Sequence, residues 1–353
     1  ECGGFGGDRM AAAGCKLHFP LSNHAVMGLS RVFAALPHFM SLASQADRYF
    51  QHHRPDAVVL IDYPGFNWWI ARRAKYHGIP VFYFVPPQIW AWASYRVHRM
   101  RRFVDHVLCS LPFEEKWYHA HHVNAEYIGH PFFDDLTQQK LDADFLAQQR
   151  ARPGLILGIL PGSRTMEVEG NFRLQLEAAR IIHLAHPETR FLVASFKPSQ
   201  QQIANKMLRD FPDVPIETHV GRTPEIMELS KLCMSVSGSV SLELLYRLKP
   251  TVILYRFSRV LTALVRALGN VKYITLVNLL ADRELYPEFK GPDWTAGEVA
   301  KAMLTWLDDE SAYRETLGAL ETLRSQVAHP GACERAAQRI LAVAGGKSLT
   351  RAA

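Results

Sequence analysis

The first half of the chain alternates short apolar runs with amphipathic stretches. The apolar runs cover residues 57–61, 81–85 and 105–109, and the amphipathic ones cover 67–77, 94–102 and 113–121. This alternation predicts strands and helices of a parallel sheet. The segment 138–152 is polar and lacks strand signals, and Pro153-Gly154 ends it. We therefore expect an inter-domain linker there.

The same rhythm restarts after the linker. Strands are predicted at 155–160, 191–195, 233–236 and 251–254, and helices at 172–185, 223–231, 239–248 and from 296 onward. The pattern predicts an α/β protein with two doubly wound, Rossmann-like domains that face a central cleft. We expect these domains at residues 1–145 and 151–328, with a C-terminal helix at 329–353 that packs back across the join.

Length and charge fit this picture and narrow the partners. A chain of 353 residues is long enough for two separate cores. The net charge of +6 and the pI near 9.0 indicate anionic partners, among which a phosphorylated lipid or an anionic membrane surface would serve as well as nucleic acid. Five scattered cysteines without a CxxC pair favour a reducing cytoplasm over a disulfide framework. Neither a signal peptide nor an apolar run long enough to cross a bilayer is recognisable.

Two loops of the second half follow predicted strands and lead into predicted helices. In the first, Gly162 allows close backbone approach, Ser163 can cap the next helix, and Arg164 can bond a phosphate with two N–H groups. The second loop places Gly238 and Ser239 before Glu243, which could hold a ribose hydroxyl pair. Such turns aim backbone N–H groups at one crevice, so together they predict a nucleoside diphosphate site. Each loop alone could be an ordinary capped turn.

Asp62 ends an apolar strand of the first domain, just before Pro64-Gly65. Active sites of α/β proteins form at that edge of the sheet. A carboxylate facing the nucleotide across the cleft could take a proton from an attacking hydroxyl. The alternatives are a turn aspartate and a capping role for Asn67.

An unusual segment, Pro86-Pro87-Gln88-Ile89-Trp90-Ala91-Trp92, follows the second strand. Trp90 and Trp92 could stack on a sugar or pack under an acyl chain, although core or inter-domain packing is the more ordinary role and is favoured for at least one of them. Arg96 opens an arginine-rich run that could meet an anionic lipid or simply form a solvated helix face. The apolar stretch 26–43, which contains Met27, is either a core helix pair or a lipid-facing patch.

Three further patterns carry no chemistry. Asp142-Ala143-Asp144 resembles a metal-binding DxD but lies in the polar linker rather than after a strand. The histidines at 119, 121 and 122 have no partner at ligand spacing. The glycines at 3–7 do not form a convincing GxGxxG, so a nicotinamide cofactor is not expected.

The ordered set of motifs resembles the lipid-A-disaccharide synthases, inverting glycosyltransferases of the GT-B type. The matching segments are 7–10, 13–15, 25–28, 61–67, 87–92, 111–114, 127–131, 160–169, 237–243 and 278–284. The resemblance implies that 2,3-diacylglucosamine moves from its UDP donor to the 6-hydroxyl of 2,3-diacylglucosamine 1-phosphate. The products are a β-1,6-linked disaccharide and UDP, formed with inversion.

The resemblance also implies roles for individual residues. Asp62 is the candidate general base, Arg164 the diphosphate contact and Glu243 the ribose contact. The donor set is completed by residues expected to line the UDP-sugar: Gly162, Ser163, Glu167, Gly238, Ser239, Arg256 and Asn278. Candidates for contact with the acceptor or lipid are Met27, Asn67, Trp90, Trp92 and Arg96. No metal and no cofactor are expected, because arginine and helix N-termini would stabilise the leaving diphosphate.

Location and partners follow from the same resemblance. We expect a cytoplasmic protein held peripherally at the inner face of the inner membrane of a lipid-A-producing bacterium, with no nucleic acid partner. The oligomeric state stays open, with a homo-oligomer among the options. The family pattern begins with a strand and a glycine-rich loop that carries an acidic Ser-Gly-Asp turn, and nothing here matches it. An opening βα unit of roughly 30 to 40 residues is therefore expected to be missing.

Two other functions remain open at this point. A UDP-N-acetylglucosamine 2-epimerase would share the two domains and the UDP site without needing the apolar stretch 26–43 or the tryptophans. A fragment that binds UDP or lipid without turnover is the non-enzymatic alternative. Gly65 also stands where many members of the family carry a second acidic residue, so Asp62 would have to act without it.

Overall fold

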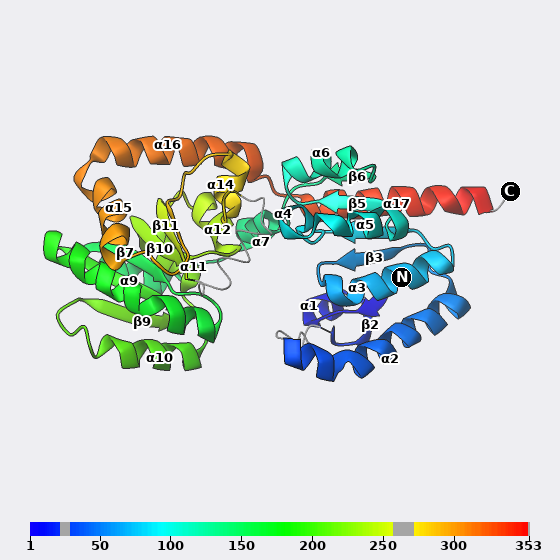
Figure 1. Cartoon of the computed structure of the whole chain (residues 1–353), viewed down its shortest axis with the longest axis horizontal. Coiled ribbons are helices and arrows are strands. Elements are labelled where there is room, and N and C mark those ends of the chain that lie inside the picture. Colours follow the sequence, from blue (N-terminus) through cyan, green and yellow to red (C-terminus); the bar gives the residue numbers. More distant parts are fainter. Residues whose placement is uncertain (22–28, 257–271, 352–353) are drawn as a thin grey trace.

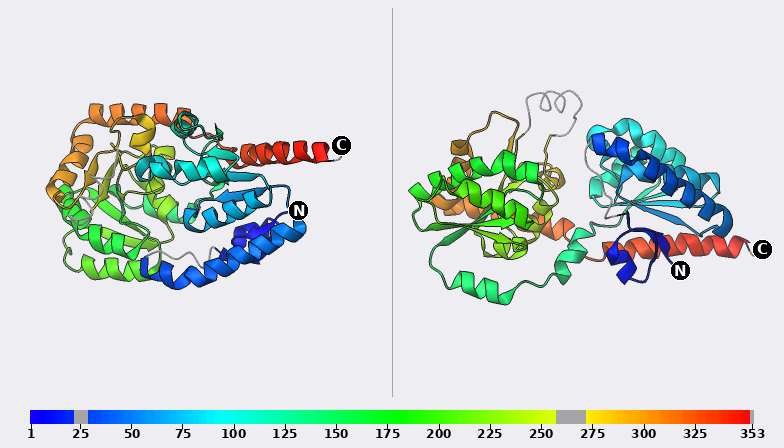
Figure 2. Two further views of the ribbon diagram at one scale, coloured as in Figure 1. Left: turned by 45° about the vertical axis from the view of Figure 1, so that its right-hand side comes forward. Right: turned by 90° about the horizontal axis from the view of Figure 1, so that it is seen from below.

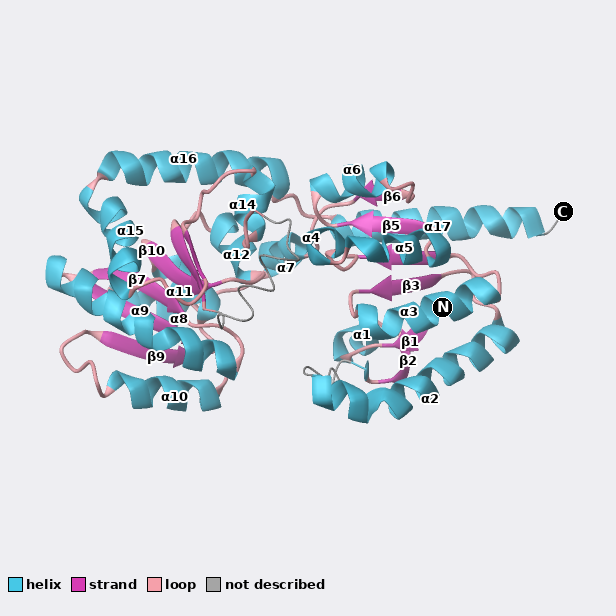
Figure 3. Cartoon of the chain, in the orientation of Figure 1, coloured by secondary structure: helices cyan, strands magenta, loops and turns pink. Residues whose placement is uncertain are grey.

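Two lobes, each built around a parallel sheet, make up the computed structural model, which describes residues 1–21, 29–256 and 272–351 (Figure 1). The first lobe contains a two-stranded and a four-stranded sheet, and the second contains a sheet of six strands. Helices cover the sheets in both lobes (Figure 3). The side chains of residues 29–35 and 346–351 are not described.

The first lobe opens with β1 (Gly3–Phe5), α1 (Asp8–Ala12) and β2 (Lys16–Phe19), and β1 and β2 pair in parallel. The long helix α2 (Leu29–His53) follows. The larger sheet has the order β3-β4-β5-β6. Its strands are β3 (Val58–Ile61), β4 (Val81–Phe84), β5 (His106–Cys109) and β6 (Ala125–Tyr127). The helices between them are α3 (Pro64–Tyr76), α4 (Ile89–Trp92), η2 (Ser94–Arg96), α5 (Val97–Phe103) and α6 (Pro112–Ala120).

The four-stranded sheet is covered on both faces by different parts of the chain. Val81 and Tyr83 of β4 face a core shared with α3, α5 and α6. Phe82 and Leu108 face the opposite way and pack with Ile128 and two alanines of α17 (Ala332–Arg351). The last helix thus covers the face of the sheet opposite the first core, and it runs beside the first lobe in both views of Figure 2.

The second lobe has the strand order β12-β11-β10-β7-β8-β9. These strands are β7 (Leu155–Leu160), β8 (Thr189–Ser195), β9 (Ile216–Val220), β10 (Leu232–Val236), β11 (Thr251–Tyr255) and β12 (Glu288–Lys290). The apolar run of β7 is almost wholly buried, as expected for a strand with helices on both faces. One face packs on α9 (Thr165–Ala185), α10 (Pro198–Leu208) and α15 (Ala296–Asp308). The other packs on α11 (Thr223–Leu229), α12 (Val240–Tyr246), α14 (Leu276–Ala281) and α16 (Glu310–Val327).

Two helices lie in and just before the segment 138–152, where the sequence predicted a linker. They are α7 (Phe132–Gln138) and α8 (Ala143–Arg150). Phe133 of α7 packs in the core of the second lobe. Asp142 caps α8 by accepting a hydrogen bond from the Phe145 N–H at 3.0 Å, and its own N–H bonds Glu225 of α11. Both helices therefore contact the second lobe.

Candidate functional site

The two candidate loops of the second lobe meet at one edge of its sheet. After β7 the chain adds β8 and β9 on one side and then returns to place β10 on the other side of β7. The winding reverses between β7 and β10, which is the switch point where doubly wound sheets bind ligands. Residues 161–164 follow β7 and residues 237–239 follow β10. Both loops therefore border this point.

The turn after β7 is closed from within by Glu167. Its Oε2 accepts the N–H groups of Ser163 and Arg164 at 3.0 and 3.1 Å, and its Oε1 pairs with Arg164 Nη1 at 2.7 Å. Gly162 has a φ of +113°, and a Cβ there would lie 2.6 Å from the Glu167 Cβ, so only glycine fits. The half-exposed Arg164 guanidinium is therefore oriented by Glu167.

This pairing changes the expectation for Glu167. A phosphate that used the same two N–H groups would have to displace the Glu167 carboxylate, because both are anions that compete for the same donors. The geometry favours Glu167 as the residue that orients Arg164. A direct bond from Glu167 to a donor molecule would require the pair to break.

Two buried side chains that sequence reasoning missed support this turn. Gln200 donates to the Ser163 carbonyl at 2.7 Å and accepts the N–H groups of residues 196 and 197, so it joins the ends of β7 and β8. Asn171 bonds the Glu167 carbonyl and accepts the Arg256 N–H at 3.1 Å. Gln200 stands at the third position of α10, as Glu167 does in α9. An acidic or amide residue at that position is a capping signal that could have identified Gln200.

The turn after β10 leaves Gly238 and Ser239 exposed at the switch point. A Cβ at Gly238 would meet no atom within 4 Å, so the space above it is open. Glu243 lies deeper, where its carboxylate pairs with Arg247 Nε at 3.1 Å and burial raises its pKa. Arg247 also bonds Glu228 at 2.9 Å. A ribose contact would therefore be made by a carboxylate already charge-balanced by Arg247.

Asn278 and Arg256 occupy different surroundings at this edge. The buried Asn278 amide accepts the N–H groups of Leu285 and Tyr286 and donates to the Tyr286 carbonyl and to Glu288, so it holds the loop before β12. Glu288, which sequence reasoning missed, also accepts N–H groups from residues 274 and 275. Arg256 is exposed directly after β11. Of these two candidates, Arg256 has the side chain with access to solvent.

Asp62 lies at the corresponding edge of the four-stranded sheet, immediately after β3. Asp62 and Tyr63 both have a left-handed backbone, with φ values of +42° and +40°. Such a conformation costs a residue other than glycine roughly 1–2 kcal/mol, and strain of this kind gathers at functional sites. Within the part of the chain that the structure describes, the exposed Asp62 carboxylate makes no hydrogen bond or ion pair.

The neighbouring strand ends carry the aromatic candidates. Trp92 is 73% exposed, whereas Trp90 is half-buried and donates its indole N–H to Glu114 at 2.9 Å. Glu114 is fully buried behind β5 and was not singled out from the sequence for any role. Arg96 stacks on Tyr95, with its guanidinium carbon 5.6 Å from the ring centroid. Trp92 is therefore available for an external contact, while Trp90 has a structural partner.

The remaining acceptor candidates divide sharply. Asn67 is buried, and its amide bonds the backbone of the Asp62 turn. Met27 lies outside the described residues, as does the beginning of the apolar stretch 26–43. Of the side chains that the structure describes in the rest of that stretch, Leu36 and Met40 are exposed on α2.

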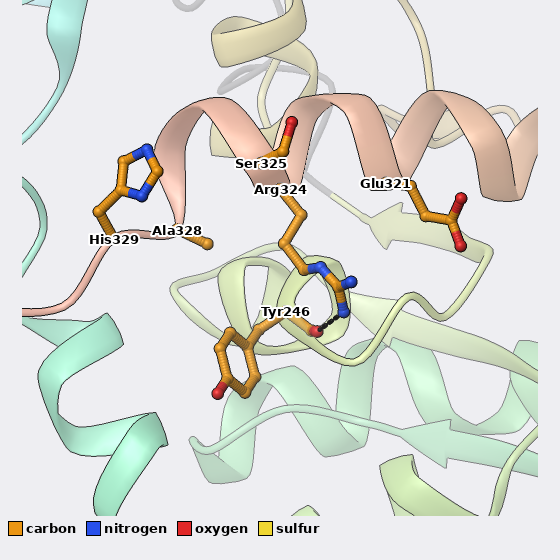
Figure 4. Close-up of a pocket in the computed structure, with 6 residues that line it drawn as sticks. All are labelled: Tyr246, Glu321, Arg324, Ser325, Ala328 and His329. Carbon is orange, nitrogen blue, oxygen red and sulfur yellow. Dashed lines mark hydrogen bonds between the residues drawn. The ribbon is translucent and has the colours of Figure 1, made fainter.

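One surface pocket of the described chain lies away from the loops that follow β7 and β10. Its lining residues are Tyr246, Glu321, Arg324, Ser325, Ala328 and His329 (Figure 4). Arg324 donates to the Tyr246 carbonyl there. Tyr246 ends α12, whereas Ser239 precedes its first residue, so the pocket stands at the other end of this helix from the switch point. It is not the candidate site.

The described residues contain neither a metal-binding cluster nor a helix that could cross a membrane. No group of three or more His, Cys, Asp or Glu side chains in residues 1–21, 29–256 and 272–351 is arranged to hold a metal ion. Over the same ranges, every helix is too short or too polar to cross a membrane.

Comparison with known families and relatives gives a single answer. Residues 1–343 match the family model described as lipid-A-disaccharide synthetase. The chain is 32% identical over 340 residues to the lipid-A-disaccharide synthase of Anaeromyxobacter dehalogenans strain 2CP-1, covering 96% of this chain and 89% of that protein. It is 31% identical to the synthase of Myxococcus xanthus, with 96% and 88% covered.

Solved structures resemble the chain in fold alone. A co-structure of S. aureus MnaA with UDP has a TM-score of 0.62 at 14% identity, covering 94% of this chain and 85% of that one. UDP-GlcNAc 2-epimerase from Neisseria meningitidis, bound to UDP-GlcNAc, has a TM-score of 0.62 at 12% identity, with 94% and 87% covered. These structures share the α/β architecture of two Rossmann-like lobes, but at 12–14% identity they show the fold alone and do not favour epimerase activity.

The match over residues 1–343 and the identities above 30% favour the synthase family over the 2-epimerases. The expected family and fold class are confirmed. The chain belongs to the lipid-A-disaccharide synthase family of glycosyltransferases and has the GT-B type of fold.

Proposed function

We propose that this chain transfers 2,3-diacylglucosamine from its UDP donor to the 6-hydroxyl of 2,3-diacylglucosamine 1-phosphate, with Asp62 as the general base. The observation that carries the reaction is the match of residues 1–343 to the family model. The sugar is transferred with inversion, so the acceptor oxygen attacks the anomeric carbon from the side opposite the leaving UDP. A base on the wall facing the nucleotide suits this direction of attack.

The donor is assigned to the switch point of the second lobe. Gly162, Ser163, Gly238 and Ser239 would surround the diphosphate, and Arg164 would neutralise it. Glu243 would hold the ribose hydroxyl pair from its place beside Arg247. Arg256 and Asn278 complete the set, Arg256 by contact and Asn278 by holding the loop before β12. The UDP in the co-structures of S. aureus MnaA and of Anabaena Alr3699/HepE, which has a TM-score of 0.53, supports a uridine nucleotide in this fold.

The chemical step needs only side chains and backbone groups of the chain. The Asp62 carboxylate takes the proton of the acceptor's 6-hydroxyl, and the hydroxyl oxygen forms the new bond to the anomeric carbon. The bond from that carbon to the UDP oxygen breaks, and its electron pair leaves with UDP. Arg164 and the backbone N–H groups of the turn after β10 stabilise the negative charge that develops there, so no metal or cofactor is required.

The acceptor and the membrane are assigned to the first lobe. Trp92 and Arg96 would contact the acceptor sugar and its phosphate, and exposed Leu36 and Met40 would meet acyl chains. The net charge of +6 favours an anionic membrane surface. We assign the protein to peripheral attachment at the cytoplasmic face of the inner membrane, without a nucleic acid partner. Its assembly into a homo-oligomer is open to measurement.

An assay of UDP release with both lipid substrates tests this function. Asp62→Asn should lower kcat by about 100-fold or more, the usual contribution of general base catalysis, while UDP affinity stays unchanged. Asp56→Asn is the matched control, because Asp56 is an exposed aspartate at the other end of the same strand. It should turn over like the wild type.

Three results would contradict the proposal. Wild-type turnover by Asp62→Asn would remove Asp62 from the role of base. Epimerisation of soluble UDP-N-acetylglucosamine without lipid would support the 2-epimerase instead. UDP binding with no disaccharide under any lipid condition would indicate a chain that binds without turnover.

A further inference from the structure

Two side chains hold the backbone of the Asp62 turn. Asn67 Nδ2 donates to the Asp62 carbonyl at 2.6 Å and to the Ile61 carbonyl at 3.1 Å. Tyr83 Oη donates to the same Asp62 carbonyl at 2.7 Å. Three hydrogen bonds from two neighbouring elements, α3 and β4, thus converge on the last residue of β3 and the one after it.

Both side chains are themselves fixed. Tyr83 is fully buried in the first core, where its ring meets Trp68 edge-on with centroids 5.8 Å apart. Burial raises the pKa of Tyr83, which favours the protonated hydroxyl that donates this bond. Asn67 is only 8% exposed, and its own N–H bonds the Tyr63 carbonyl at 3.1 Å. Neither residue can move aside without disturbing the core.

These contacts explain how an unfavourable turn persists. Asp62 and Tyr63 both have φ near +40°, a conformation that residues other than glycine leave unless the surroundings impose it. Rotation of Asp62 back to a negative φ would swing its carbonyl away from Tyr83 and Asn67. It would also redirect the bond from Cα to Cβ, and with it the carboxylate.

We propose that Tyr83 and Asn67 are positioning residues for the general base: by gripping the Asp62 carbonyl they fix the direction in which its carboxylate projects from the sheet edge. The inference rests on the proposed role of Asp62. Neither residue touches substrate in this assignment, so Asn67 moves from the acceptor set, where the sequence placed it, to the support of the base.

Tyr83→Phe tests the inference by removing one oxygen atom from a buried ring. We expect kcat to fall by about 10- to 100-fold, because displacing a reacting group by about 1 Å has effects of this order. KM for both lipids and the affinity for UDP should stay within about twofold, because uniform substrate binding is not affected. Asn67→Asp, which keeps the shape but loses the donor, should act in the same direction.

Tyr118→Phe is the matched control. Tyr118 is fully buried in the same core, and within the described part of the chain its hydroxyl has no hydrogen-bond partner. The control therefore removes the same atom from the same kind of site without touching the Asp62 turn. Its kcat should equal that of the wild type.

A double-mutant cycle separates positioning from general support of the fold. In an Asp62→Asn background, Tyr83→Phe should lower the residual activity by less than about twofold, because the group that it positions is gone. An equal loss in both backgrounds, or wild-type kcat in Tyr83→Phe itself, overturns the inference alone. Wild-type turnover in Asp62→Asn would instead remove the base, and the inference with it.

Discussion

Glu114 shows how a buried carboxylate can serve structure at the edge of an active site. Its Oε1 accepts the Trp90 indole N–H, and its Oε2 accepts the N–H groups of Ser110 and Leu111 at 3.2 and 3.0 Å. Burial raises the pKa of Glu114 to about 7, although these three hydrogen bonds pull in the opposite direction. Burial and, to a smaller extent, the negative charge of Glu114 raise the pKa of Tyr118 on the same helix and of Cys109 on β5. The residue therefore ties α4 and α6 together and titrates near neutrality.

The raised pKa predicts how stability depends on pH. Between pH 4.5 and about 7 the unfolded state has lost this proton and the folded state has kept it, so the free energy of unfolding falls as pH rises. The contribution is fully present below pH 4.5, is lost by about pH 7, and amounts to about 3 kcal/mol at most. Urea unfolding of wild type and Glu114→Gln across this range should show a slope that the variant lacks. Parallel curves would refute the assignment.

Single residues were predictable from sequence where strand ends alone decide their place. Asp62, Arg164 and Gly238 all lie in the turns that follow strands, as the apolar runs indicated. The partners of Glu167 and Asn278 were not predictable in this way. Asn278 bonds Glu288, ten residues further on, only because the loop before β12 folds back over it.

At the scale of elements, the strands with continuous apolar runs were predicted, and β9 and β12 were missed. The prediction for β7 was confirmed to the residue, because a continuous apolar run has no other favourable place. β9 escaped because all five of its residues are only partly buried, and β12 because it has three residues. The helix α8 was read as linker, although Asp142 before it is a normal cap.

Asp134 of α7 joins two elements that are far apart in sequence. Its two carboxylate oxygens accept the N–H groups of Gly331, Ala332 and Cys333 at 2.6, 3.1 and 2.8 Å, and these bonds lower the pKa of Asp134. The carboxylate thereby caps the N-terminus of α17. It thus joins the start of α17 to α7, the helix at which the chain first leaves the first lobe.

Loss of this cap should loosen α17 locally. Asp134→Ala is expected to cost about 1–2 kcal/mol, the upper range for a helix cap, since three N–H groups lose their acceptor. Hydrogen exchange should accelerate at the first turns of α17 more than in β7. Asp135→Ala is the control, because its pair with Arg9 is exposed on both sides and contributes little. Equal exchange in wild type and Asp134→Ala would show that packing alone holds the helix.

At the scale of the whole molecule, the chain returns from the second lobe to the first, where α17 packs on the four-stranded sheet. The fold class was expected from the repeated strand-and-helix rhythm and is confirmed by the solved relatives. The sequence did not reveal which apolar residues α17 would cover. Ala336 is 4% exposed against Phe82 and Leu108, whereas Ala337 is exposed.

One pair of variants tests how far the first lobe depends on that contact. Ala336→Glu buries an unpaired charge and should destabilise the first lobe by about 3 kcal/mol or more. Ala337→Glu makes the same change one residue further along, on the solvent side, and should leave stability within about 0.5 kcal/mol. Thermal unfolding followed by circular dichroism measures both. Similar melting temperatures for the two variants would mean that α17 does not dock as the structure has it.

The path of α17 has a consequence for anyone who recombines members of this family. A chimera with a single crossover near residue 131 would combine the first lobe of one parent with α17 of the other. That helix has been selected to pack on the other parent's counterparts of Phe82, Leu108 and Ile128. Chimeras should therefore be spliced twice, so that residues from 330 onward come from the same parent as residues 1–131. Hybrids made with a single crossover are expected to express poorly even where each parental half is sound.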